Sequence, residues 1–401
     1  MFNSMTKRLS TSMISRLRNR LDLPGLAKSP LRRSISVNRQ RYEVLAEDVF
    51  RRILCWERKR AERSGKGFLL MLGEMESLRR AEEGQRTLRR IAAALYKCTR
   101  DTDIVGWYRE GGVLGAIFTE VNKANGCAPE SLIRAKVTAE LRDDLGAERF
   151  GQIHLSFYTF PDDWDQADSR GPADKVLYPD LVERSEEQRA AYVVKRLVDI
   201  AGSLLALVLG SPLWVAISLA IKLTSKGPIL FKQERVGWYG RRFTFLKFRS
   251  MKCANDPGIH REYVRRLIAG AADSTPGNGN QKAVYKIPDD PRVTRVGKFL
   301  RTTSLDELPQ FINVLRGEMS LVGPRPPIPY EVEVYQPWHR SRVLEARPGI
   351  TGLWQVRGRS RLNFNDMVRL DLRYARTWSL GSDLRIALQT PRAVLSCQGA
   401  Y

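Results

Sequence analysis

The 401-residue sequence predicts an α+β protein in which a small mixed domain is followed by a second, membrane-anchored α/β domain. Three observations lead to this prediction. Helical and strand-like patterns alternate over residues 41–160, and a polar linker follows over residues 161–190. The segment Ile200–Ile221 then runs for 22 residues without a charge, which is the length of a membrane span.

The charge balance indicates an anionic partner. The chain has 67 Lys and Arg against 44 Asp and Glu, a net charge of +23, which suits nucleic acid, anionic lipid or a phosphorylated substrate. No known nucleic-acid-binding motif accompanies this charge, so we expect no nucleic-acid partner. The five scattered cysteines form no CxxC pair and there are only three histidines, which argues against a disulfide framework, a zinc site or a histidine-based metal site.

Residues 1–40 form a basic, serine-rich tail in which Asp22 is the only acid. Apolar residues recur there every four positions, at Met5, Leu9, Met13, Leu17 and Leu21. This spacing suits an amphipathic helix on an anionic membrane surface, and a disordered tail is the open alternative. The tail has no apolar core of signal-peptide length, so secretion is not expected.

Residues 41–160 show the order helix, strand, helix, two strands joined by a turn, helix, strand. The expected elements span 42–63, 67–72, 82–98, 104–108, 113–118, 130–144 and 153–160. This order predicts a ferredoxin-like α+β core.

One stretch of this domain, Asp103–Gly112, resembles the diguanylate cyclase (GGDEF) domain, which is a nucleotidyl-cyclase-like fold. In that family two acids follow the glycine pair, whereas Val113 and Leu114 stand there in this chain, and the metal-binding acid of the family falls near Gly73. The resemblance therefore implies a degenerate relative without catalysis, serving regulation or a homodimer. An unrelated small α/β domain is the alternative.

The apolar segment contains Ser211-Pro212 at its middle, and proline there removes a helix hydrogen bond and kinks the helix. Basic residues flank both ends, with Lys195 and Arg196 before the segment and Lys222 and Lys226 after it. A simple span carries its Lys/Arg excess on one side. The sequence thus leaves two topologies open, a kinked span and a re-entrant helix that returns to the same face.

The stretch from Ser304 to Gly317 predicts one capped helix. Ser304 is expected as N-cap, Glu307 would complete a capping box, and Gly317 stands at the C-terminal position that favours glycine. Asp306 and Glu307 then lie in the first turn, beside free N–H groups where phosphate can approach. Ordinary helix punctuation is the alternative interpretation of the two acids.

Residues 191–397 closely resemble the monotopic phosphoglycosyl transferases of bacteria, also called the bacterial sugar transferase family. The matching stretches occur in family order and are Lys195–Asp199, Ser211-Pro212, Phe231–Gly237, Lys247–Met251, Arg301–Asn313, Gly323–Pro326 and Arg347–Arg359. The resemblance implies a phosphoglycosyl transferase domain over residues 191–401 with a re-entrant helix at about 194–223. It also implies a monotopic protein at the cytoplasmic face of the bacterial inner membrane.

For this family the resemblance implies transfer of a sugar-1-phosphate from a UDP-sugar to undecaprenyl phosphate, with release of UMP. Asp306 would attack the β-phosphate, and Glu307 would hold Mg²⁺. Arg301 and Arg325 are expected to bind the phosphates, because a guanidinium pairs bidentately with phosphate. Glu307 cannot fully serve both the capping box and the metal, so we expect Ser304 to cap alone.

Lys195, Arg196 and Asp199 are expected at the membrane interface, beside anionic lipid, with snorkelling anchors as the alternative. The product would enter exopolysaccharide, capsule or O-antigen assembly at its first membrane step. The alternative function is a nucleotide-sensing regulator of inactive-cyclase type attached to a membrane domain. The sequence does not specify the sugar.

Overall fold

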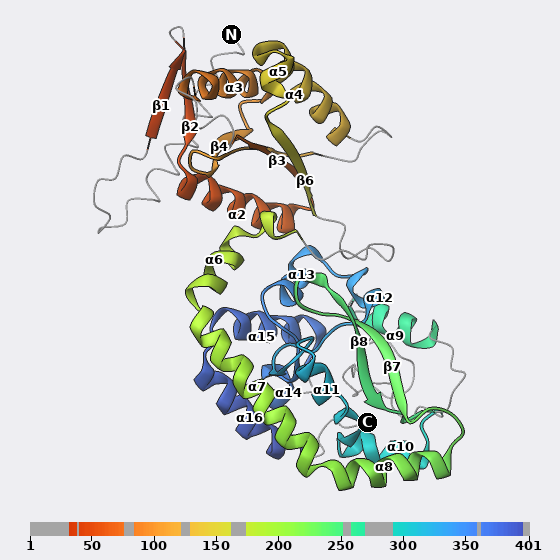
Figure 1. The fold of residues 1–401 in the computed structure, drawn as a ribbon. Coiled ribbons are helices and arrows are strands. Elements are labelled where there is room, and N and C mark those ends of the chain that lie inside the picture. Colours follow the sequence, from red (N-terminus) through yellow and green to blue (C-terminus); the bar gives the residue numbers. More distant parts are fainter. Residues whose placement is uncertain are drawn as a thin grey trace. The chain divides into compact units, whose positions relative to one another are not determined.

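The computed structural model describes residues 32–37, 40–75, 84–121, 129–161, 174–251, 258–268, 292–358 and 362–395. The chain divides into two compact units, an N-terminal unit up to Asp162 that also includes Val176–Asp180, and a C-terminal unit with the remaining residues (Figure 1). Most of the predicted basic tail, residues 1–31 and 38–39, lies outside the described residues.

The N-terminal unit contains a six-stranded sheet in the order β1-β2-β4-β5-β3-β6. Its strands are β1 (Arg32–Val37), β2 (Gln40–Leu45), β3 (Phe68–Glu74), β4 (Ile104–Arg109), β5 (Val113–Phe118) and β6 (His154–Phe160), and its helices are α2 (Glu47–Ser64), α3 (Gly84–Cys98), α4 (Pro129–Leu145) and α5 (Ala147–Phe150). From β3 to β6 the connectivity is β-α-β-β-α-β, which confirms the ferredoxin-like prediction. The predicted helix start at Tyr42 is wrong, because Leu45 pairs in parallel with Gly106 and α2 begins only at Glu47.

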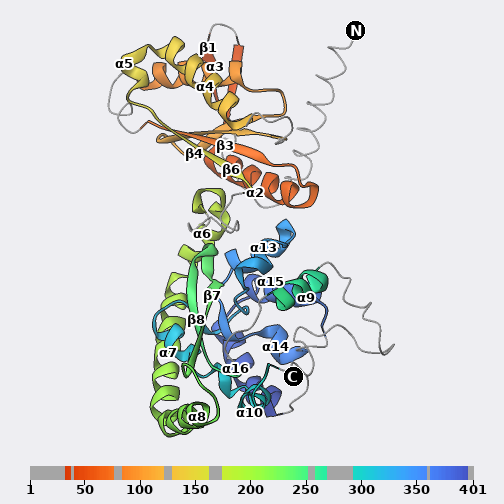
Figure 2. The same ribbon diagram turned by 90° about the vertical axis from the view of Figure 1, so that its right-hand side faces the viewer.

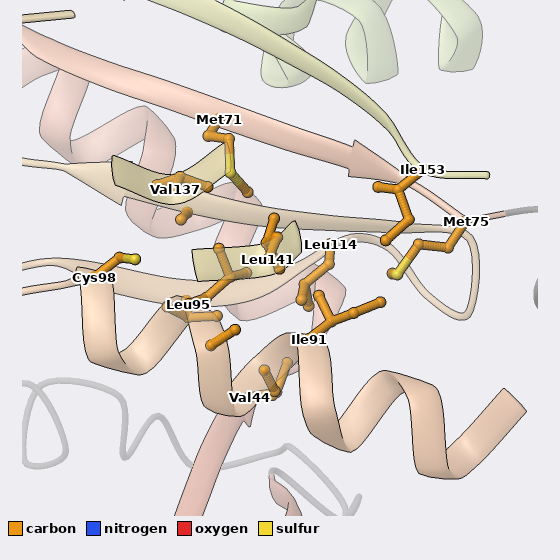
Figure 3. Packing of buried hydrophobic residues seen from close by; sticks show 14 of the residues in the cluster. Val44, Met71, Met75, Ile91, Leu95, Cys98, Leu114, Val137, Leu141 and Ile153 are labelled. Atoms are coloured by element: carbon orange, nitrogen blue, oxygen red, sulfur yellow. The ribbon is translucent and has the colours of Figure 1, made fainter. Parts of the chain in front are cut away.

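Helices α3 and α4 cover one face of this sheet and bury its main apolar core. Figure 3 shows Ile91 and Leu95 of α3 and Leu141 of α4 meeting Met71 and Leu114 of the strands, and all five are at most 3% exposed. Interdigitated side chains of this kind supply most of the stabilisation of a small domain.

On the opposite side, α2 approaches the sheet over a pair of glycines. Gly106 and Gly115 are direct neighbours on β4 and β5, and the ring of Phe50 lies over them. A Cβ at Gly106 or Gly115 would stand 2.5 or 2.6 Å from that ring. The fully buried Phe50 therefore requires glycine at both strand positions.

Three positions at which the predicted GGDEF resemblance would require acids serve packing in this chain. Val113 and Leu114 are 4% and 2% exposed on β5, and Gly73 pairs with Leu114. In the described part of the chain, no group of three or more histidine, cysteine or acidic side chains could hold a metal ion. Strand β5 is buried along its whole length, which explains apolar residues at Val113 and Leu114 by packing.

The C-terminal unit resumes at Leu181, within α6 (Pro179–Glu187) of the predicted linker, and α7 (Arg189–Leu209) follows. It continues with α8 (Ser211–Thr224), the hairpin of β7 (Leu230–Val236) and β8 (Arg242–Phe248), α9 (Gly258–Ile268), α10 (Arg295–Thr302), α11 (Gln310–Leu315), β9 (Ser320–Val322), α12 (Pro329–Val332), α13 (Pro337–Leu344), β10 (Gly349–Thr351), α14 (Leu353–Arg357), α15 (Phe364–Arg376) and α16 (Leu380–Leu395). Strands β7 and β8 pair antiparallel and β9 and β10 pair parallel, and Figures 1 and 2 show the β7–β8 hairpin as a long ribbon of this unit.

The predicted break at Ser211-Pro212 is confirmed. Helix α7 ends at Leu209 and α8 begins at Ser211, with a bend of 62° between them. The Ser211 hydroxyl donates to the Val208 carbonyl at 2.8 Å, so it covers one of the carbonyls left open at the end of α7. Among the described helices none is long and apolar enough to cross a membrane alone, and this bent pair is the one combination that passes by length and composition.

The bent pair has two different sides. One side packs inward, where Ile217 and Ile221 of α8 contact the buried Phe248 and Leu300. The other side exposes a continuous series of apolar residues, Leu197, Val198, Leu204, Leu205, Val208, Leu209, Leu213, Val215, Leu219 and Leu223, each more than 40% exposed. An exposed apolar surface of this extent is typical of a membrane or protein contact.

Candidate active site

The acidic turn that carries Asp306 and Glu307 does not have the predicted capped-helix geometry. Ser304 lies in the left-handed region with φ 57° and ψ 18° and makes no side-chain cap, so the predicted capping box is wrong. Helix α10 ends at Thr302, and the 3₁₀ turn η6 (Leu305–Glu307) begins three residues later. Ser304 connects the two in a left-handed conformation, whereas an N-cap residue needs an extended backbone. The C-terminal glycine is confirmed, because Gly317 has φ +82° and its N–H donates to the Val314 carbonyl.

The two acids of this turn lie in different surroundings. Asp306 is buried, with 9% of its surface exposed. The Glu307 side chain is about one-fifth exposed, and its Oε1 lies 2.9 Å from Nη1 of Arg325. The Glu307 carboxylate, which was predicted to bind a metal ion, therefore already contacts the guanidinium group of Arg325.

Lys247 of β8 lies within electrostatic range of the whole site. Burial lowers the pKa of its ammonium group to about 8; Asp306 opposes this shift, whereas Arg235, Arg325 and Arg301 add to it. The Lys247 Nζ also lies 5.2 Å from the ring centroid of Phe231, its partner across the hairpin. Lys247 thus interacts electrostatically with the carboxylate of Asp306 and with three arginines.

The structure therefore brings together four of the predicted site residues, Asp306, Glu307, Arg301 and Arg325. Sequence reasoning missed Lys247 and Arg235. The signal was present, because cations alternate with apolar residues on both predicted strands, but alternation does not tell which face meets the acidic turn. The hairpin register decides this, with Leu246 and Phe248 buried on either side of Lys247.

Arg325 belongs to a proline-rich loop that is held by its carbonyl groups. Three of its residues lack an N–H, so the backbone can be anchored mainly through acceptors. Each carbonyl from Pro324 to Pro327 accepts a hydrogen bond: Pro324 from Gly349 N (2.9 Å), Arg325 from Arg342 Nη2 (3.2 Å), Pro326 from Arg235 Nη1 (2.8 Å) and Pro327 from Val236 N (2.9 Å). The loop thus presents Arg325 on a fixed backbone.

A buried ion pair supports this loop from behind. Arg342 Nη2 lies 2.6 Å from Asp371 Oδ2, and both side chains are at most 5% exposed. Burial raises the pKa of Asp371 to about 6 although Arg342 opposes the shift. Arg342 also donates to the Tyr335 hydroxyl at 3.2 Å. One guanidinium therefore connects Asp371 and Tyr335 to the Arg325 carbonyl.

Helix α7 is attached to the site by the three residues that were expected at the membrane interface. Arg196 donates to the carbonyls of Val314 and Leu315 at the end of α11, at 2.6 and 2.8 Å. Asp199 Oδ1 accepts from the Ser320 hydroxyl at 3.0 Å and the Leu321 N–H at 2.9 Å. Lys195 Nζ donates to the Val322 carbonyl at 3.0 Å and pairs with Asp383.

These contacts correct the earlier expectation for two of the residues. Lys195 and Asp199 are 8% and 2% exposed, so they face the protein interior and neither lipid head groups nor a snorkelling position is available to them. The physical reason is that their partners, a strand carbonyl and a strand N–H, come from segments more than 120 residues away. The polar side of α7 is a structural contact surface.

The comparison with known protein families covers this same unit. The family model described as "Bacterial sugar transferase" matches residues 190–397, just over half of the chain. The chain belongs to the bacterial sugar transferase family. The matched range contains Asp306, Glu307, Lys247 and all the arginines of the site.

Curated members of the family align with the sugar transferase unit. The galactosyl transferase CpsE of Streptococcus agalactiae is 43% identical over 210 residues, 52% of this chain and 43% of that protein. The undecaprenyl-phosphate galactose phosphotransferase of Salmonella typhimurium is 39% identical over 55% of this chain and 44% of that protein. The UDP-glucose:undecaprenyl-phosphate glucose-1-phosphate transferase of Caulobacter vibrioides is 41% identical over 52% of this chain and 72% of that protein. The matched part thus spans less than half of the first two relatives.

Solved structures match other parts of the chain only distantly. A DGC protein from Thermotoga maritima is 20% identical and covers 30% of this chain and 86% of that chain, with a TM-score of 0.25. The GGDEF domain of DgcB from Caulobacter crescentus is 13% identical and covers 34% and 79%, with a TM-score of 0.25. Scores this low assign no family to the N-terminal unit, so its likeness to a GGDEF domain stays a prediction.

Proposed function

We propose that this sugar transferase moves a sugar-1-phosphate from a UDP-sugar to undecaprenyl phosphate through a covalent intermediate on Asp306, with release of UMP. The observation that carries the proposal is a buried carboxylate, Asp306, that interacts electrostatically with Lys247, and three arginines act on the same lysine. The names of the Salmonella and Caulobacter relatives, which specify these substrate classes, support it. The name of the exopolysaccharide production protein ExoY of Rhizobium meliloti supports a place at the start of glycan assembly, as for exopolysaccharide, capsule or O-antigen.

In the first step a carboxylate oxygen of Asp306 attacks the phosphorus that bears the sugar. A new O–P bond forms, the P–O bond to UMP breaks, and UMP leaves with the electron pair. A carboxylate is a weak nucleophile, and acyl-phosphate formation divides one difficult displacement into two easier ones. Lys247, Arg235, Arg301 and Arg325 balance the negative charge that the diphosphate brings to the turn.

In the second step the phosphate of the lipid acceptor attacks the same phosphorus. The bond to Asp306 breaks, the carboxylate is regenerated, and the product is an undecaprenyl diphosphosugar. Arg325 suits both steps, because its backbone is fixed by the Arg342 and Arg235 hydrogen bonds on either side. A fixed guanidinium loses little conformational entropy when it binds phosphate.

Mg²⁺ fits the donor set of this turn. The ion prefers carboxylate and phosphate oxygens and commonly binds one or two protein carboxylates, and Glu307 is a partly exposed carboxylate directly after Asp306. Glu307 would hold the ion, which would supply charge neutralisation at the diphosphate. Arg325 contacts Glu307 in the structure, so Glu307 would hold the ion beside a guanidinium that already contacts this carboxylate.

We also place the protein on the cytoplasmic face of the bacterial inner membrane as a monotopic protein with a re-entrant α7–α8 pair. Its apolar legs, Ile200–Leu209 and α8, are about 15 and 21 Å long at 1.5 Å per residue. Bent by 62° and inserted apex first, they would reach only about 8–11 Å into a hydrocarbon core of roughly 30 Å. Both legs pack on the same body, α7 against α11 and β9, and α8 against α10. A crossing orientation would draw that charged body into lipid.

The test uses the full chain in detergent with Mg²⁺, undecaprenyl phosphate and a panel of UDP-sugars, and measures UMP release. Asp306→Asn should abolish UMP release, and Asp366→Asn, an exposed acid on α15, should not change it. Intact-protein mass spectrometry without acceptor should show the mass of one phosphosugar on the wild type and none on the Asp306 variant. Absence of UMP with every UDP-sugar, or full activity of Asp306→Asn, would contradict the proposal.

A further inference from the structure

A second polar pocket lies outside the Asp306 site. It has a volume of about 800 Å³ and is formed by α14, α15 and α16 of the C-terminal unit. It is lined by Leu353, Val356, Arg357, Arg373, Tyr374, Thr377, Ser382, Arg385, Ile386, Gln389, Arg392 and Ala393. None of these residues belongs to the acidic turn or to its cations.

Four arginines stand around this pocket without an acidic counterpart. Arg357, Arg373, Arg385 and Arg392 are all exposed, and no acid is among the lining residues. Within the described part of the chain, none of the four side chains makes an ion pair or a side-chain hydrogen bond, whereas Arg376 and Arg369 on the same α15 do. A concave surface with four such guanidinium groups is complementary to phosphate.

The floor of the pocket is rigid. Tyr374 and Ile386 are at most 4% exposed and pack with Val322, Leu353 and Val356 in one apolar cluster. The Tyr374 hydroxyl has two acceptors for its one proton, Asp383 Oδ1 at 2.7 Å and the Val322 carbonyl at 3.0 Å. The arginines therefore extend from a packed base, as in a preformed site.

The pocket borders an apolar surface. At 3.6 residues per turn, Arg385 and Arg392 lie on one line of α16, with Ile386 on the buried side and Leu384 and Leu388 on the other. Leu384 and Leu388 are 62% and 71% exposed. Lys195 of α7 pairs with Asp383 in the first turn of α16, so this end of α16 contacts the polar side of α7.

We infer that this pocket binds the phosphate group of an anionic lipid head group. Guanidinium groups at the edge of an exposed apolar helix face stand at the depth where head-group phosphates lie when that face enters a membrane surface. The same chemistry would accept the phosphate of a small soluble molecule, and the border with Leu384 and Leu388 favours the lipid. The site would thereby orient α14–α16 on the membrane independently of the proposed reaction.

The experiment measures ligand binding, so it does not depend on transferase activity. Detergent-solubilised full chain is titrated calorimetrically with dioctanoyl phosphatidic acid, dioctanoyl phosphatidylcholine and glycerol 3-phosphate. The test variant is Arg385→Ala/Arg392→Ala. The matched control, Arg241→Ala/Arg369→Ala, removes the same charge from exposed positions that do not line the pocket.

We expect the phosphatidic acid to bind at least tenfold more tightly than the phosphatidylcholine, a preference that the test variant loses and the control keeps. The unfolding midpoint of both variants without lipid should equal that of the wild type, which excludes misfolding as the cause. If both double variants prefer phosphatidic acid over phosphatidylcholine to the same extent, the pocket is not the binding site. The preference would then come from the overall positive charge. Glycerol 3-phosphate binding as tightly as the lipid would overturn the lipid as the source of the phosphate.

Discussion

Arg325 and Glu307 form an ion pair across the acidic turn, with Nη1 and Oε1 2.9 Å apart and each side chain about one-fifth exposed. The pair joins the proline-rich loop to the residue that follows the buried Asp306. A guanidinium in this position can exchange a carboxylate for a phosphate, and a carboxylate can exchange a guanidinium for a metal ion. We therefore expect this ion pair to separate when a diphosphate substrate binds with Mg²⁺.

The first prediction concerns this pair. Glu307→Gln should lower kcat for UMP release by about 10²-fold and raise the Mg²⁺ concentration for half-maximal rate, because a neutral amide binds the metal weakly. Arg325→Lys should lower kcat/KM by roughly 10- to 100-fold, because an ammonium cannot contact phosphate through two parallel hydrogen bonds. Steady-state kinetics at varied Mg²⁺ measures both. An unchanged Mg²⁺ dependence in Glu307→Gln would rule out Glu307 as the metal ligand.

The second prediction concerns Lys247, whose pKa of about 8 makes its charge sensitive to pH near neutrality. The KM for the UDP-sugar should rise as the pH increases through about 8, because the ammonium is lost. Lys247→Arg should remove this rise, since a guanidinium stays protonated. KM profiles between pH 7 and 9.5, with Lys232→Arg on the exposed side of β7 as control, provide the test. A rise that persists in Lys247→Arg would assign it to another group.

The same residue predicts a stability effect with a defined sign. The folded-state pKa of Lys247 lies below the usual value of 10.5, so between pH 8 and 10.5 the unfolded chain binds more protons than the folded one. The free energy of unfolding of the wild type should therefore increase over this window relative to Lys247→Met. Denaturant titrations at pH 7.5, 9 and 10 test it, and parallel curves for the two proteins would contradict the lowered pKa of the Lys247 ammonium.

The fourth prediction concerns the attachment of α7. Asp199→Ala should lower the free energy of unfolding by about 2–4 kcal/mol, because the Ser320 hydroxyl and the Leu321 N–H lose their acceptor in a buried place. Val198→Ala, one position earlier and 57% exposed, should change it by less than about 0.5 kcal/mol. Denaturant unfolding in one detergent compares the two. Equal effects would mean that Asp199 contributes no more than an exposed residue.

The last prediction concerns topology. In a background with the five native cysteines replaced by alanine, Glu187→Cys and Lys226→Cys flank the bent pair on exposed positions. A membrane-impermeant maleimide should label both from the cytoplasmic side only, because a re-entrant helix returns its ends to one face. Labelling from opposite sides would establish a kinked span instead.

The sequence alone determined the features that local patterns encode. Apolar periodicity predicted the helices and strands of β3–β6, and Ser211-Pro212 predicted the break between α7 and α8, because proline lacks the N–H that a continuous helix needs. These features depend on neighbours a few positions apart. The roles expected for Asp306, Glu307, Arg301 and Arg325 came instead from the resemblance to the sugar transferase family.

Only the tertiary structure decided which side chains meet. It turned Ser304 into a left-handed residue, directed Glu307 to Arg325, and added Lys247 to the site through the register of β7 and β8. It also buried Lys195 and Asp199 in contacts that the sequence had assigned to the membrane. The physical reason is that a local pattern does not specify which face of an amphipathic element is buried. Contacts with residues 18 to 127 positions away decide it.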